Sequence, residues 1–180
     1  HVEFILDILN TYIPDSTKLV LHADDLLCSS LKPENRRAFF GIAPLPGEEQ
    51  EPPNIVRDVR SCPQCGAPLE WDYLRYHHIG QAHCPRCGFS SPTANYQVTA
   101  LDARHHQMTV SGRYGDQDFP IPNTSIINVY NALSAVALLG EFGLSKERIA
   151  QCMEHISIVE SRYWEENVGG RRLVLHLAKG

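Results

Sequence analysis

Two closely spaced cysteine pairs constrain this chain more than any other feature of its sequence. The pairs are Cys62-Pro-Gln-Cys65 and Cys84-Pro-Arg-Cys87, with 18 residues between them. Two CxxC pairs at roughly this separation are typical of a zinc ribbon, in which each pair turns tightly and directs two sulfurs at one ion. The sequence therefore predicts a metal site with four thiolate ligands.

The residues after each pair support this interpretation. Gly66 and Gly88 directly follow the second cysteines, where the turn requires a backbone angle that glycine adopts readily. Four protein ligands leave no open coordination position, so the site is expected to be structural rather than catalytic. A ribbon of about 35 residues has too small a core to fold alone, and the metal would supply the missing stability.

Other uses of these cysteines stay open. The four thiols could instead form two disulfides or remain free, and iron competes with zinc because similar cysteine turns can hold it. His77, His78 and His83 lie nearby in the sequence, and His83 is the histidine considered as a ligand. Four sulfurs already satisfy the ion, so we interpret these histidines as surface residues of the ribbon.

Composition limits the class of protein. The chain has 180 residues and a net charge of −5, from 16 basic and 21 acidic side chains, which argues against nucleic-acid binding. No apolar run approaches the roughly 20 residues of a membrane helix, and Glu3 and Asp7 interrupt the only stretch that resembles a signal peptide. We therefore expect reduced cysteines, a cytoplasmic location and no transmembrane segment. Both ends look cut, so we interpret the chain as a fragment of a longer protein.

Hydrophobic spacing predicts an α/β fold. A helix over residues 1–12, a buried strand over 18–22, a turn or short helix over 24–29 and a strand over 37–42 alternate along the chain. Such alternation favours a mostly parallel sheet with helices packed against it. We divide the chain into a first part of this α/β domain at 1–58, an inserted zinc ribbon at 59–96, and a second part at 97–180.

The second part is expected to hold strands, helices and a hairpin. Residues 97–103 and 107–111 look like paired strands. Asn123 or Thr124 can cap a helix that runs to Phe142, and Ser145 can cap another. Gly169-Gly170 separates two strand-like runs and could close a hairpin.

Three segments together resemble one family, the Mur ligases, in their central domain and specifically in the MurT type. They are Leu19-Val-Leu-His-Ala-Asp-Asp25, Asn128-Val-Tyr-Asn131-Ala-Leu-Ser-Ala135 and Ser161-Arg-Tyr-Trp-Glu165. His22 and Ser161 stand where the family usually shows Asn and Gly. A four-cysteine ribbon inserted between the first and second segments is a feature of the MurT type.

The resemblance implies a function. Mur ligases are ATP-dependent ligases that activate a carboxylate as an acyl phosphate, which an amine then attacks. MurT-type proteins pair with a glutamine amidotransferase, GatD, which releases ammonia from glutamine. The pair amidates the D-glutamate of the peptidoglycan precursor lipid II to D-isoglutamine. The chain is thus expected to be a partial Mur-ligase-like central domain.

The resemblance also implies roles for four residues. Asn128 and Asn131 would face the adenine and ribose of ATP, Arg162 would lie near the phosphates, and Glu165 would support that arginine or the nucleotide. The plainer interpretation is that the two asparagines form the polar face of a helix and that Arg162 makes a surface ion pair. Asp24 and Asp25 could contact a ligand, but the favoured interpretation is that they form a turn and cap a helix.

Other parts of a Mur ligase are expected outside this chain. They are the phosphate loop, the magnesium-binding glutamate and the carboxy-terminal domain, so ATP and Mg²⁺ belong to the full-length protein. The fragment alone is expected to be inactive and to associate with itself through an uncovered sheet edge or apolar face.

A different class of function remains as an alternative. The ribbon could be a non-enzymatic module that binds nucleic acid or protein, because it carries both basic and aromatic side chains. The basic ones are Arg60, Arg75 and Arg86, and the aromatic ones are Trp71, Tyr73 and Tyr76. Glu70 and Asp72 dilute the positive charge, which weakens this alternative.

Overall fold

A mixed five-stranded sheet forms the centre of the molecule. The computed structural model describes residues 2–48, 59–157 and 163–176 of the chain. The helices and strands are α1 (Val2–Tyr12), β1 (Leu19–His22), α2 (Leu26–Ser29), β2 (Arg37–Ile42), β3 (Glu70–Tyr76), β4 (Ile79–His83), β5 (Tyr96–Asp102), β6 (Gln107–Gly112), β7 (Gln117–Pro120), α3 (Ile126–Glu141), α4 (Lys146–Met153), β8 (Tyr163–Val168) and β9 (Arg171–His176).

The main sheet has the order β1-β2-β5-β6-β7. β1 pairs with β2 and β2 with β5 in parallel, whereas β5, β6 and β7 pair in antiparallel fashion. Four of the five strands consequently run in one direction. The predicted α/β class with a mostly parallel sheet is confirmed, and the reversed strand β6 adds an antiparallel part that the prediction did not specify.

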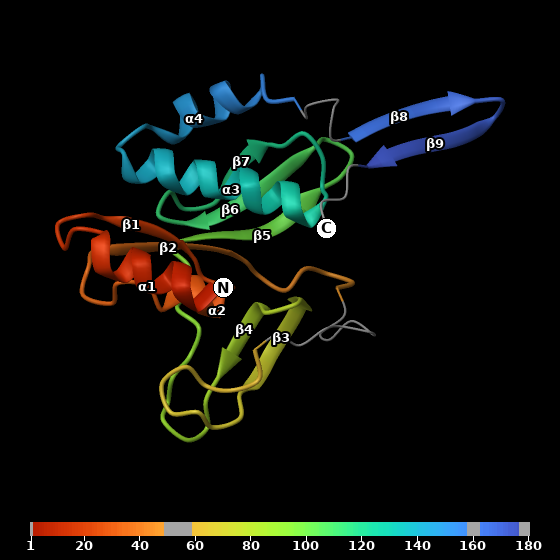
Figure 1. Cartoon of the computed structure of the whole chain (residues 1–180). Helices are drawn as coiled ribbons and strands as arrows, with labels where there is room; N and C mark the ends of the chain where they lie inside the picture. The colour runs from red at the N-terminus through yellow and green to blue at the C-terminus, as the bar shows by residue number, and fades with distance from the viewer. Residues whose placement is uncertain (1, 49–58, 158–162, 177–180) are drawn as a thin grey trace.

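Helices cover both faces of the sheet (Figure 1). α3 and α4 pack on one face over a core that includes Phe40, Ile42 and Tyr96. α1 packs on the other face, where Leu6 and Ile13 lie against a smaller cluster of Leu19, Leu21 and Leu31. Alternate residues of a strand point to opposite faces, so the short strand β1 contributes to both cores.

The ribbon is a separate two-stranded sheet of β3 and β4, drawn beside the main sheet in Figure 1. Its turn is formed by His77 and His78, and His77 has a φ of 50°. The Gly80 N–H donates to the Asp24 carbonyl oxygen at 2.7 Å, and Ile79 forms a bridge with Asp25. Backbone contacts thus connect the tip of the ribbon to the end of β1.

Gly80 lets the two strands of the ribbon approach each other closely. A Cβ at this position would lie well inside van der Waals contact with the Tyr73 carbonyl and would also crowd the Leu74 Cα. We expect Gly80→Ala to lower the free energy of unfolding by about 1–3 kcal/mol, as overpacking against fixed backbone does. Urea unfolding of the two proteins measures this, and an unchanged midpoint would contradict the close approach.

The other elements mostly follow the sequence predictions. β2 has the predicted bounds, and β8 and β9 form the predicted hairpin, with Gly169 and Gly170 both at positive φ. Ser145 caps α4 by accepting from the Arg148 N–H. Among the described helices, none combines the length and apolar character needed to cross a membrane.

One local prediction is wrong, and one strand was not predicted. The N-cap of α3 is Ser125, because the Asn123 side chain instead accepts the Ser125 N–H at 3.0 Å and forms a turn ahead of the helix. Strand β7 was not predicted: it has four residues and ends in a proline, so its local sequence looks like a loop. Pairing with β6 makes it a strand. Such pairing depends on the tertiary context rather than on local propensity.

Candidate functional site

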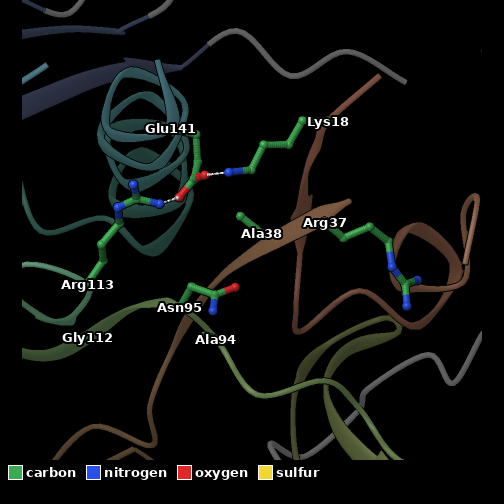
Figure 2. A pocket seen from close by; sticks show the side chains of 8 residues that line it. All are labelled: Lys18, Arg37, Ala38, Ala94, Asn95, Gly112, Arg113 and Glu141. Carbon is green, nitrogen blue, oxygen red and sulfur yellow. Dashed lines mark hydrogen bonds and ion pairs between the residues drawn. The ribbon is translucent and has the colours of Figure 1, made fainter. Parts of the chain in front are cut away.

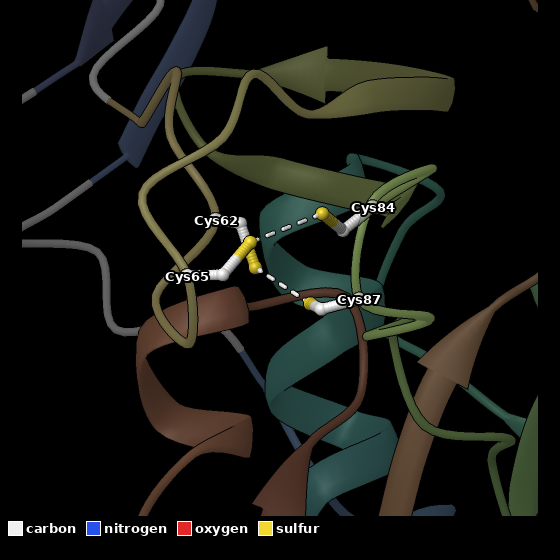
Figure 3. Close-up of side chains that lie close together, drawn as sticks. All are labelled: Cys62, Cys65, Cys84 and Cys87. Carbon is white, nitrogen blue, oxygen red and sulfur yellow. Dashed lines mark hydrogen bonds between the residues drawn. The ribbon is translucent and has the colours of Figure 1, made fainter.

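The four predicted cysteines lie together at one end of the ribbon (Figure 3). Their sulfurs all lie within 4.8 Å of one another. The Cys62 and Cys87 sulfurs are 3.6 Å apart, and so are those of Cys65 and Cys84. Four sulfurs bound tetrahedrally to zinc at about 2.3 Å would be separated by about 3.8 Å. The arrangement therefore fits a single tetrahedral ion.

Both CxxC turns have the same backbone geometry. The Gly66 N–H donates to the Cys62 carbonyl at 2.9 Å, and the Gly88 N–H to the Cys84 carbonyl at 3.1 Å. The two glycines have φ angles of 71° and 75°, as expected from their place after the second cysteine. Each turn thus holds its pair of sulfurs through local backbone bonds.

The surroundings of the Cys84 sulfur favour a thiolate, whereas at Cys87 the backbone hydrogen bond from Phe89 is outweighed by burial and the neighbouring thiols, which raise the pKa of Cys87. Burial opposes ionisation of Cys84, but backbone N–H groups of Cys87 and Arg86 lower the pKa of its thiol to about 6. His83, the histidine considered as a ligand, faces carboxylates rather than the sulfurs. Its ring lies 3.1 Å from a carboxylate oxygen of Asp72 and also beside Glu70. Within the described residues His83 is not part of the sulfur cluster.

A buried polar cluster joins the ribbon to the sheet around Asp24, which is fully buried at the end of β1. One carboxylate oxygen accepts from the Tyr130 hydroxyl at 2.7 Å and from the Ile42 N–H at 2.9 Å. The other accepts from the Tyr73 hydroxyl at 3.0 Å and from the Gln81 amide at 3.2 Å. These donors come from β2, α3 and both strands of the ribbon.

Arg75 completes this cluster and corrects a prediction. Its guanidinium lies 3.7 Å from Asp24 and donates to Glu48 at 2.8 Å and to the Ala43 carbonyl at 3.2 Å. Burial opposes its charge, but the bonds with Glu48 outweigh this and raise its pKa. The sequence suggested that Arg75 belongs to a basic ribbon surface, whereas only 8% of it is exposed.

Asp25 caps α2, as the favoured interpretation predicted. Its carboxylate accepts from the N–H groups of Leu27 and Cys28 at 2.9 and 3.0 Å. Burial opposes ionisation, but hydrogen bonds from His78 and Cys28 lower its pKa to about 2. Asp25 is therefore ionised near neutral pH and serves the local fold.

The four residues that the family resemblance assigned to the nucleotide do not lie together in one site among the described residues. Asn131 is exposed on α3 and lines a pocket that it shares with His22 and the ribbon turn. The Asn128 amide donates to the Asn123 side chain at 3.0 Å, and Asn128 does not line that pocket. Glu165 forms an ion pair with Arg172 across the β8–β9 hairpin. Arg162 lies outside the described residues.

The protonation state of His22 decides which hydrogen-bonding groups this residue offers to the pocket. Burial lowers the pKa of His22, against the opposing attraction of Asp24 and Asp25. Its Nδ1 accepts the Asp24 N–H at 3.2 Å. The neutral imidazole therefore carries its proton on Nε2, which makes that nitrogen a donor.

Stability should depend on pH through His22 in a definite direction. Below the ordinary histidine pKa of about 6.5, the unfolded chain takes up this proton more readily than the folded one. Stability falls on acidification until the lowered pKa is passed. We expect the unmutated protein to lose stability relative to His22→Gln between about pH 7.5 and about pH 5.5. Urea unfolding at both values measures this.

His105 provides a control of opposite sign. The hydrogen bond that the His105 ring donates to the Asp102 carboxylate raises the pKa of His105, so its contribution is present at low pH and lost as pH rises through that pKa. His105→Asn should therefore lose stability relative to the unmutated protein on acidification. Parallel pH profiles for both variants would contradict the assignment.

A second pocket of ≈ 450 Å³ lies at the opposite end of the parallel strands (Figure 2). Lys18 precedes β1, Arg37 begins β2 and Asn95 precedes β5, so this is their amino-terminal edge. Glu141 lies between Lys18 and Arg113 and pairs with both, which neutralises much of the positive charge. Ligands of open α/β sheets bind at the carboxyl ends of strands, so we assign no nucleotide to this pocket.

Comparison with known proteins identifies the relatives of this fold. The chain is 28% identical over 174 residues to the MurT subunit of lipid II isoglutaminyl synthase from Staphylococcus aureus strain COL, covering 96% of this chain. The resemblance to the MurT type is confirmed. The chain spans 38% of the length of that MurT relative.

Two further comparisons agree with this result. The MurT subunit from Streptococcus pneumoniae strain R6 is 27% identical over 121 residues, covering 66% of this chain and 26% of the relative. A pseudomurein peptide ligase type C from Methanothermus fervidus superposes with a TM-score of 0.71 at 25% identity, over 88% of this chain and 30% of that structure. No protein-family model matches the chain.

Proposed function

We propose that this chain is part of an ATP-dependent ligase of the MurT type that forms amide bonds on a peptidoglycan precursor. The similarity to MurT over 96% of the chain carries this proposal. The pseudomurein peptide ligase structure supports the proposal further, because this chain shares its fold as well as part of its sequence.

The proposed reaction follows from the class of the relatives. ATP transfers its terminal phosphate to the α-carboxylate of D-glutamate in lipid II and leaves as ADP. Ammonia attacks the acyl phosphate carbonyl, inorganic phosphate leaves, and the carboxylate becomes a carboxamide. Ammonia would come from a glutamine amidotransferase partner. ATP and Mg²⁺ would be bound by the complete protein in the cytoplasm.

We further propose that Cys62, Cys65, Cys84 and Cys87 hold one structural zinc ion. Their sulfur separations match tetrahedral coordination, and four protein ligands would leave zinc no position for a substrate. Thiolate ligands favour zinc or iron over hard cations. The ion would hold the ribbon together, while the reaction takes place elsewhere.

The nucleic-acid alternative loses its main support in the structure. Arg75 is buried and paired with Glu48 and Asp24, so it cannot contribute to an exposed basic face. Positive charge on such a face provides most of the affinity for nucleic acid.

The experiment that tests the function is an amidation reaction. The complete protein is incubated with ATP, Mg²⁺, an ammonium salt and lipid II, and the precursor is analysed by mass spectrometry. We expect ATP-dependent conversion of one carboxylate to a carboxamide. Glutamine should replace the ammonium salt when the amidotransferase partner is added. An unchanged precursor under both conditions would contradict the proposal.

A further inference from the structure

A pocket lies where the ribbon meets the α/β part of the chain. Three elements surround it: the end of β1, the turn between β3 and β4, and the first half of α3. Its volume of ≈ 460 Å³ is within the range of small-molecule sites. The residues that matter below are His22, Tyr76, His77, Ile127, Tyr130 and Asn131.

The lining of this pocket suits a flat, uncharged ring. Five of its eight described lining residues carry aromatic or imidazole rings, and none of the eight is a lysine or arginine. Rings of this kind stack on any nucleobase, because every base has a π face. Asn131 can both donate and accept hydrogen bonds, and His22 offers an Nε2–H donor. Phosphate groups would find no cationic partner among these residues.

The buried cluster around Asp24 fixes the ribbon against this pocket. Tyr73 and Arg75 lie on β3 just before the turn, and both contact the cluster. Tyr130 donates to Asp24 and also lines the pocket, where its ring centroid lies 4.3 Å from that of His22. The position of the ribbon turn is therefore coupled to the same residues that form the opposite wall.

We propose that the turn at the tip of the ribbon forms one wall of a nucleobase pocket, so that the ribbon and the α/β part bind the base together. Tyr76 and His77 supply ring surface from the ribbon, while Ile127 and Asn131 supply apolar contact and an amide from α3. The inference rests on the proposed ligase function, which requires a nucleotide. It gives the ribbon a direct role in nucleotide binding.

The test compares two variants of the complete protein with matched controls. His77→Asn removes a ring and keeps a residue that tolerates positive φ, and Ile127→Ala shortens an exposed side chain on the facing wall. His106→Asn is the matched control, because His106 also has positive φ but lies in the β5–β6 turn and does not line the pocket. Leu138→Ala is the control for the exposed position on α3.

Calorimetry with ATP and with inorganic tripolyphosphate separates base binding from phosphate binding. A stacked base contributes roughly 1–3 kcal/mol. We therefore expect His77→Asn to weaken ATP binding at least about fivefold, Ile127→Ala to weaken it severalfold, and both controls to bind ATP normally. Tripolyphosphate should bind all five proteins equally.

The outcomes distinguish this inference from the proposed function. If the unmutated protein binds ATP and both pocket variants bind it equally well, the ribbon wall is wrong while the ligase proposal stands. Equal weakening of ATP and tripolyphosphate would also overturn the ribbon wall. An unmutated protein that binds no ATP would count against the ligase function, and the inference would fall with it.

Discussion

Cys84→Ser is expected to abolish stoichiometric metal binding and to unfold the ribbon. Removing one of four thiolates should cost more than about a hundredfold in affinity, since losing even a group behind a ligand costs about 10–100-fold. The ribbon contributes few buried apolar residues of its own around the sulfurs, namely Cys62, Ala67 and Cys84. Folding of a unit this small would depend on the proposed metal. Metal content after gel filtration measures the loss of binding, and the rate of limited proteolysis within residues 59–96 measures unfolding of the ribbon.

Cys152→Ser is the matched control for this experiment. Cys152 is exposed on α4 and lies outside the sulfur cluster, so its loss should leave metal content and proteolysis unchanged. A Cys84→Ser protein that keeps one metal per chain and resists protease like the unmutated protein would contradict the assignment of Cys84 as a ligand.

Asp24→Asn should cause the largest loss of stability among single substitutions that nearly keep the volume of a side chain. Asp24 is fully buried and accepts four hydrogen bonds from Tyr73, Tyr130, Gln81 and the Ile42 N–H. An amide turns one acceptor into a donor facing other donors, and it removes the charge beside Arg75. Breaking a buried charge pair typically costs about 3–5 kcal/mol, and we expect a loss of this size. Urea unfolding measures it.

Asp25→Asn is the control for Asp24→Asn. It tests whether the loss of stability comes from the burial and hydrogen bonds of Asp24 rather than from the loss of a charge alone. Asp25 caps α2, and asparagine caps helices about as well as aspartate. The ion pair with His78 is partly exposed, and such pairs contribute about 0–1 kcal/mol. We expect a loss of less than about 1 kcal/mol. Equal losses for Asp24→Asn and Asp25→Asn would show that the buried cluster does not hold the ribbon in place.

The features that the sequence predicted correctly are those set by local geometry. The two CxxC turns bring each pair of sulfurs together through bonds that span only a few residues, and Gly66 and Gly88 reveal the required backbone angles. The bounds of β2 follow from a short apolar run with a clear start and end. The helix cap at Ser145 likewise depends only on the residues that follow it.

The buried cluster could not be predicted because its contacts join distant parts of the chain. Arg75 and Glu48 are 27 residues apart, and Tyr130 and Asp24 are 106 residues apart. In the sequence, Arg75 stands among alternating polar and aromatic residues, a pattern typical of an exposed hairpin. The tyrosines at positions 73 and 76 on either side of Arg75 were the only local feature of note, and they do not indicate that the arginine is buried.

The two asparagines that the family resemblance assigned to the nucleotide show the same limit within one helix. Asn128 and Asn131 are three positions apart on α3, and the resemblance to the Mur ligases implied that both would contact ATP. Of the two, Asn131 lines the pocket, whereas the Asn128 amide donates to the Asn123 side chain ahead of the helix. The resemblance to a family located the helix, while the loop before it decided which amide remains available to a ligand.

Native mass spectrometry of the unmutated protein tests the basis of this account most directly. We propose that four thiolates hold one ion in the ribbon and that the ribbon turn forms one wall of a nucleobase pocket. We expect a mass equal to the chain plus one zinc ion and release of this ion on denaturation in acid, as the proposed zinc site requires. A metal-free mass, with Cys62, Cys65, Cys84 and Cys87 joined in two disulfides, would contradict it.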